Sequence, residues 1–134
     1  MTMQVIPDTA KLKRRVIEAA ITAGGDTGGL LAAVANAFGV PVVIRGWIVK
    51  LSAASGGAAT GDLGIASDGT TLSDTLGDGI DINTTATTND IDNKGSNGAS
   101  ARSWSTTQFV TFSIATGTDG AVAGRLLIFV DIGI

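Results

Sequence analysis

Apolar and polar residues alternate most clearly in the middle of the chain, from Pro41 to Ala53. In an extended strand, residues 43, 45, 47, 49 and 51 share one face and residues 42, 44, 48 and 50 the other, because side chains alternate with a period of two. Pro41 can open such a strand, and Gly46 in its middle indicates a bulge or a close approach of another backbone. We therefore predict a strand over residues 41–53.

Five further segments are short, apolar and bounded by turn residues, which is typical of strands. They are residues 15–23, 29–38, 61–68, 105–115 and 121–130. The Leu and Ala content of residues 29–38 also suits a helix, but ten residues between glycines is short for one, so a strand is preferred. Asp68-Gly69 is a turn dipeptide at the end of the third of these segments.

The last two segments are separated by Thr116–Gly120, a loop with two glycines, and are predicted to pair as an antiparallel hairpin. Six or seven strands with frequent turns, and no alternation with long helices, predict an all-β fold, an antiparallel β-sandwich or jelly roll. The polar stretch from Thr70 to Ala101 is predicted to be a long loop. Its scattered apolar residues are expected to pin it to the core; they are Leu72, Leu76, Ile80, Ile82 and Ile91.

Residues 1–14 have no strand pattern and contain Pro7, so they are predicted to form an extended N-terminal arm, followed by one β-sandwich domain over residues 15–134. No run of about 18 apolar residues is present, and the N-terminus lacks the apolar stretch of a secretory signal. We therefore expect neither a membrane span nor a membrane partner, and synthesis in the cytoplasm.

Charge is segregated along the chain although the net value is only −3. Four cations lie within five residues at the start, namely Lys11, Lys13, Arg14 and Arg15, whereas seven Asp residues and no cation lie between residues 62 and 92. The basic cluster suits a solvated tail or an acidic protein partner. Without neighbouring aromatic residues it is a weak signal for nucleic acid, so no nucleic-acid partner is expected.

The charged fraction is 16%, below the roughly 25% of ordinary soluble domains. A surface of small polar residues, or apolar surface covered by other subunits, would account for the difference. The chain has no Cys, His or Tyr, which excludes histidine acid–base chemistry, thiolate attack and the usual zinc sites. We predict a protein that is not an enzyme and needs no cofactor.

Two possible binding features remain in the loops and at one strand edge. Asp78, Asp81 and Asn83 offer oxygen ligands at near-alternate positions, which suits Ca²⁺, but turn chemistry is the simpler interpretation. Trp47 lies within a strand and is expected in the core. Trp104 lies in a polar run at the edge of a strand and is expected to anchor an interface.

The order of segments resembles small structural proteins of tailed bacteriophages that act as capsid decoration (cement) proteins. The resemblance covers residues 15–134 and rests on VIEAAITAGGDTGGLLAAVANAFGVPVVIRGWIVKLSAASGGAATGDLGIASDGTTLSDTLGDGIDI and on the later ARSWSTTQFVTF. It implies a jelly-roll module that assembles as a homotrimer on the outside of the virion, is made in the host cytoplasm, and bridges adjacent capsomers of the major capsid protein.

On this resemblance, the arm would reach onto the capsid lattice. Val5, Ile6 and Leu12 would be its apolar contacts, and Lys11, Lys13, Arg14 and Arg15 would pair with acidic capsid surface. The alternatives are a phage tail, neck or fibre-base protein, and a calcium- or carbohydrate-binding β-module that uses the loop from Thr70 to Asn93.

Overall fold

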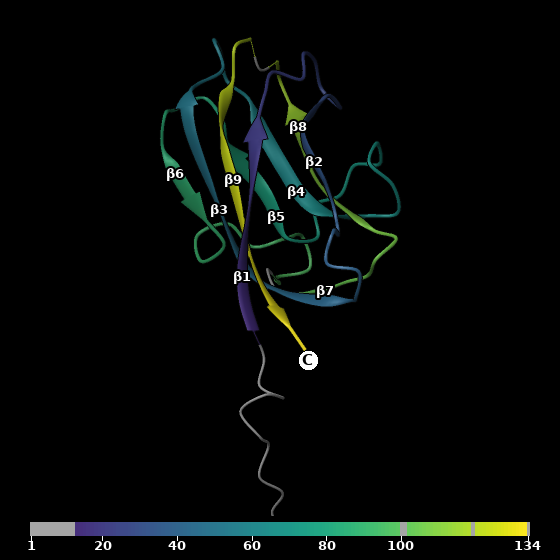
Figure 1. The fold of residues 1–134 in the computed structure, drawn as a ribbon. Coiled ribbons are helices and arrows are strands. Elements are labelled where there is room, and N and C mark those ends of the chain that lie inside the picture. The colour runs from purple at the N-terminus through teal and green to yellow at the C-terminus, as the bar shows by residue number, and fades with distance from the viewer. Residues whose placement is uncertain (1–12, 100–101, 119, 134) are drawn as a thin grey trace, which may run out of the picture.

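The computed structural model describes residues 13–99, 102–118 and 120–133, and these contain nine strands and no helix. The strands form two antiparallel sheets packed face to face (Figure 1). They are β1 (Lys13–Ile21), β2 (Leu30–Ala35), β3 (Val42–Ala53), β4 (Thr60–Ala66), β5 (Gly77–Asp81), β6 (Thr87–Asn89), β7 (Arg102–Trp104), β8 (Phe109–Thr116) and β9 (Ala123–Ile132). The predicted all-β sandwich is confirmed, and its architecture is consistent with a jelly-roll-like fold.

We call the two layers sheet A and sheet B. Sheet A has the order β1-β9-β3-β6, with β7 also paired to β3, and sheet B has the order β2-β8-β4-β5. In the described part of the chain no helix is long and apolar enough to cross a lipid bilayer.

The core lies between the two sheets and is built around Trp47, Trp104 and Phe112, whose side chains are all inaccessible to solvent. Sheet A contributes Ile44, Leu126, Ile128 and Val130, and sheet B contributes Leu63, Val110 and Ile114. The indole Nε1 of Trp47 donates a hydrogen bond to the carbonyl of Leu76 at 2.9 Å. The expected core position of Trp47 is confirmed, and its one polar atom is satisfied there.

Gly46 marks a bulge in β3, as the sequence suggested, because the register with β9 shifts between Ile44 and Gly46. The bulge reverses which residues face the core. Val42 and Ile44 point inward before it, and Trp47, Val49 and Leu51 point inward after it. The strict alternation predicted for residues 43–51 was therefore wrong for Val43 and Arg45, which are exposed.

The predicted hairpin between the last two strands was wrong. β8 pairs with β2 and β4 in sheet B, whereas β9 pairs with β1 and β3 in sheet A. The connection from β8 to β9 therefore crosses between the layers, and Val122 on it is buried. Both strands lie inside their sheets, where each needs a neighbour on either side. Each strand has both of its neighbours in its own sheet, β2 and β4 for β8 and β1 and β3 for β9, so no edge is left for a hairpin between them.

The described part of the predicted long loop, residues 70–99, is not a loop throughout, since it contains β5 and β6. Leu76, Ile80 and Ile82 are fully buried, which confirms their predicted role as anchors. Leu72 and Ile91 are exposed, with 46% and 79% of their surface accessible, so that role was wrong for these two.

Candidate partner-binding surface

The predicted binding residues of the N-terminal arm are only partly visible in the structure. Val5, Ile6, Lys11 and Leu12 lie outside the described residues. Lys13, Arg14 and Arg15 belong to β1, which begins two residues earlier than the expected domain boundary at residue 15. All three are exposed, but they are residues of a paired strand whose partners on β9 are Ile132, Asp131 and Val130.

Trp104 is not an interface anchor in this chain. Its side chain is fully buried, its Nε1 donates to the carbonyl of Gln108 at 2.9 Å, and its own carbonyl accepts from Asn36 Nδ2 at 3.0 Å. Pairing of β7 with β3 turns this ring inward into the sandwich. The polar residues before Trp104 suggested a surface position. In β7 those residues are exposed, and Trp104 is the one buried residue of the strand.

The outer face of sheet B is covered by the chain itself over β4 and β8. The loop at residues 71–73 lies over it, because Thr111 Oγ1 donates to the carbonyl of Thr71 at 3.0 Å and a Cβ on Gly64 would meet Ser73. As a result, β8 is buried on both faces, and even Thr111 and Ser113 are almost inaccessible. This covering explains why the polar residues on the outer side of β8 are inaccessible to solvent.

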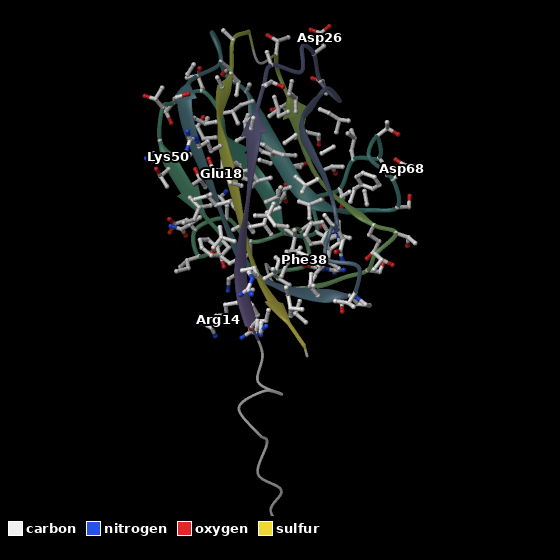
Figure 2. All side chains as sticks on the ribbon, viewed as in Figure 1. Arg14, Glu18, Asp26, Phe38, Lys50 and Asp68 are labelled. Carbon is white, nitrogen blue, oxygen red and sulfur yellow. The ribbon has the colours of Figure 1, made fainter. Side chains whose placement is uncertain are left out.

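Among the described residues, no such loop covers the outer face of sheet A at β1. It presents Arg14, Val16 and Glu18 from β1, Arg125, Leu127 and Phe129 from β9, and Val43, Arg45, Ile48 and Lys50 from β3. Figure 2 shows Arg14 towards the start of β1 and Glu18 further along the same strand. The half-buried side chains of Leu127, Phe129 and Ile48 make an apolar strip across this face, with charged groups on either side.

At one end of this strip, Asp131 is held between two arginines. Its Oδ1 lies 3.2 Å from Arg14 Nε and its Oδ2 lies 3.5 Å from Arg45 Nε. The carboxylate side chain is only 7% exposed, whereas those of Arg14 and Arg45 are 84% and 58% exposed. Asp131 Oδ1 makes no aligned hydrogen bond, so its contact with Arg14 is an ion pair. Both guanidinium groups therefore keep donors directed to solvent.

Shallow cavities lie at both ends of the strip. One of about 620 Å³ is lined by the three arginines Arg14, Arg15 and Arg45 together with Val16, Phe129 and Asp90. The other, of about 450 Å³, lies by the ion pair of Arg125 Nη1 with Glu18 Oε1, 2.7 Å apart, and is lined also by Lys50 and Leu127. Exposed arginine beside apolar side chains is the composition typical of protein–protein contact sites.

The sequence missed Arg45, Asp131 and Phe129 as members of this surface. Arg45 was placed on the wrong face because of the bulge, and Asp131 stood alone at the end of an apolar strand. Strand alternation in β9 places Arg125, Leu127, Phe129 and Asp131 on one side and is the signal that could have found them. A central strand that is apolar on both sides conceals that signal.

Asp81 and Asn83, two of the three possible calcium ligands, belong to one turn. Asp81 Oδ1 accepts from the backbone N–H of Asn83 at 2.7 Å and its Oδ2 accepts from Thr84, which confirms the turn interpretation. Asp78 instead lies with Asp62 and Asp74, all with carboxylate oxygens within 4.8 Å of one another. Burial raises the pKa of Asp62, the charges of Asp78 and Asp74 act in the same direction, and the Gly79 N–H opposes them.

No protein-family model and no curated protein matches this chain. Its structure is similar to a chain of the capsid of Ralstonia phage GP4, with a TM-score of 0.53 and 17% sequence identity over 96% of this chain and 90% of that one. It is also similar to a chain of the acidic stable capsid structure of Helicobacter pylori bacteriophage KHP30, with a TM-score of 0.44, 12% identity, and 90% and 94% of the two chains covered. The resemblance to phage head proteins is confirmed at the level of the fold.

Proposed function

We propose that this chain is a structural protein of a bacteriophage particle that binds the outside of the capsid as an oligomer and bridges adjacent capsomers. The observation that carries the proposal is the fold, a β-sandwich similar over nearly its whole length to a chain of the Ralstonia phage GP4 capsid. The proposal has three finer parts, namely the decoration role, the major capsid protein as partner, and the homotrimer. These parts rest on the resemblance found in the sequence.

The asymmetry of the sandwich supports a docking role. On sheet B the loop at residues 71–73 covers β4 and β8, whereas sheet A leaves an apolar strip with exposed arginines at its end. Lys13, Arg14 and Arg15 continue the basic stretch that begins at Lys11, and of these three residues Arg14 lies on the outer face of sheet A. An acidic capsid surface is the partner that matches its charge.

Many weak contacts suffice for such a protein. Copies placed side by side on a repeating lattice bind with high effective concentration, so no single contact needs high affinity. The low charged fraction of the chain agrees with an exterior that is partly covered by neighbours.

The test is binding to phage particles assembled without this protein, measured by co-sedimentation. Deletion of residues 2–12 is expected to weaken binding by about tenfold or more, equivalent to roughly 1.4 kcal/mol, while leaving the melting temperature unchanged. The deletion stops before Lys13 because β1 begins there and a larger one would remove pairs with β9. Binding should also fall as salt rises, since exposed charges are screened beyond about 8 Å at physiological ionic strength.

A matched control removes one cation elsewhere. Lys94→Gln changes an exposed loop cation in the acidic half of the chain and should bind like the wild type. Equal binding by the deletion variant would contradict the proposed role of residues 2–12. Co-sedimentation with isolated tails and not with heads would favour the alternative of a tail, neck or fibre-base protein.

A further inference from the structure

The outer edge of β1 is the longest sheet edge in the described part of the chain. β1 has nine residues and, among the strands that the structure describes, pairs only with β9, at the end of sheet A (Figure 1). The other edge strands β6 and β7 have three residues each, β5 has five, and β2 has six with a shift in its register. Edge backbone groups that lack a partner are a template for pairing with another strand.

β1 also lacks two features that usually prevent such pairing. It contains no proline, and its nine consecutive pairs with β9, from Lys13–Ile132 to Ile21–Gly124, run without a bulge. Val16, a β-branched apolar residue, is 55% exposed on this strand. The edge is therefore straight and regular, and an apolar side chain lies near its centre.

The geometry points to a two-fold contact in which β1 of one copy pairs antiparallel with β1 of a second copy, centred on Val16. This contact concerns the isolated protein and does not depend on the proposed function. It joins the A sheets of two copies into one continuous sheet through a self-complementary interface. Because such a contact joins two copies only, a cyclic trimer would need a different surface.

Charge fixes the register of this pair. A two-fold axis through Val16 places Arg14 of each copy opposite Glu18 of the other, and opposite charges across a strand pair are stabilising. It also places Lys13 opposite Ala19 and Arg15 opposite Ile17, so no cation faces a cation. An axis through residue 15 or 18 sets like charges against each other, and one through residue 17 pairs Glu18 with Val16.

The two flanking ion pairs extend this match into a row of alternating charge. Within one copy, Arg14 already contacts Asp131 at 3.2 Å and Glu18 contacts Arg125 at 2.7 Å. Across the contact, the order becomes Asp131, Arg14, then Glu18 and Arg125 of the second copy. Both central side chains have exposed surface left for this, 84% for Arg14 and 51% for Glu18. The two-fold axis repeats the row, with the two Val16 side chains between the copies.

Cysteine cross-linking tests the register directly, because the chain has no cysteine of its own. Val16→Cys places two thiols opposite each other, and a short bismaleimide should convert the protein into covalent dimers on a denaturing gel. Ala20→Cys is the matched control on the same exposed face. In this register, its two copies are separated by eight strand positions, about 26 Å, and should not cross-link. Equal yields from the two variants would overturn the register.

A charge exchange tests the pairing independently. Arg14→Glu and Glu18→Arg, each combined with Val16→Cys, put like charges opposite each other in their own dimers. Each alone should lose most of the cross-linking, about tenfold or more. An equimolar mixture of the two variants should regain the cross-linking. In the mixed dimer, position 14 of each variant lies opposite position 18 of the other. Both of these cross-strand pairs then join a carboxylate to a guanidinium group.

Each variant keeps the same environment within its own chain whether alone or mixed, so altered folding cannot produce the recovery. Circular dichroism melts show whether both variants fold. If either does not, the contrast between Val16→Cys and Ala20→Cys decides alone. Failure of the mixture of folded variants to recover would refute the charge pairing. If Val16→Cys binds phage particles like the wild type but never forms covalent dimers, this contact is refuted and the proposed function is left intact.

Discussion

At the scale of single residues, Asp68 has the most strongly shifted carboxyl group among the described residues. Its Oδ1 accepts from the backbone N–H groups and the hydroxyls of Thr70 and Thr71, at 2.8 to 2.9 Å. These hydrogen bonds, the Thr70 N–H first, lower its pKa from 3.8 to about 2. Asp68 therefore holds the turn that leads into the loop over sheet B, on the side of the view away from Arg14 and Glu18 (Figure 2).

Asp68→Ala should lower the melting temperature at pH 7 by a few degrees. The folded chain has the lower pKa, so this contribution to stability is present above pH 3.8 and is lost as the pH falls towards 2. The difference in melting temperature from the wild type should therefore shrink between pH 4 and 2. Asp92→Ala, which removes another exposed loop carboxylate, controls for the change in net charge. A difference that stays constant down to pH 2 would contradict the account.

At the scale of elements, the start of β5 is set by the approach of β3. Gly77 lies against Trp47, and a Cβ built there would come within 2.6 Å of the indole ring and 3.0 Å of the side chain of Ile80. The ring is fully buried and cannot move aside. A glycine is required at this position because the two strands approach so closely.

Gly77→Ala should reduce the free energy of unfolding by about 1–3 kcal/mol, the usual cost of overpacking a filled core. Urea denaturation followed by circular dichroism measures the loss, and tryptophan emission of the folded state should shift because Trp47 is displaced. Gly56→Ala is the control, since a Cβ at Gly56 meets nothing within 4 Å. Equal stability of the two variants would show that the space at Gly77 is not limiting.

Strand positions could be predicted from the sequence, but strand partners could not. Local alternation and turn residues located β1, β2, β3, β4, β8 and β9 to within a few residues. Pairing depends on contacts between residues far apart in the chain, which no local pattern records. For that reason the short loop at Thr116–Gly120 suggested a hairpin, although it crosses between the two sheets.

The candidate surface could be predicted only in part. The basic cluster at Lys13, Arg14 and Arg15 was evident from charge alone, and the structure places it on an exposed edge strand. Arg45 and Asp131 join Arg14 only because β1, β9 and β3 are neighbours in sheet A. Trp104 was misassigned because polar neighbours say nothing of which way a strand residue points.

At the scale of the whole molecule, the two sheets share one core. The buried cluster joins side chains of sheet A, such as Ile44 and Leu126, to side chains of sheet B, such as Leu63 and Phe112. Among the described residues, neither sheet has a second hydrophobic layer on its outer face. The outer face of sheet B is covered only in part, by a loop, and little of the chain lies over the outer face of sheet A. Separation of the sheets would therefore expose most of the core at once.

Unfolding in urea should accordingly be a single cooperative transition. Tryptophan fluorescence reports on Trp47 and Trp104, which lie on the strands of sheet A, while far-ultraviolet circular dichroism reports on both sheets. The two probes should give the same midpoint and slope. Repeating the measurement at several protein concentrations separates folding from pairing, because an associating protein has a midpoint that rises with concentration. A fluorescence transition that precedes the dichroism transition would show that sheet A can unfold while sheet B persists, and would contradict a shared core.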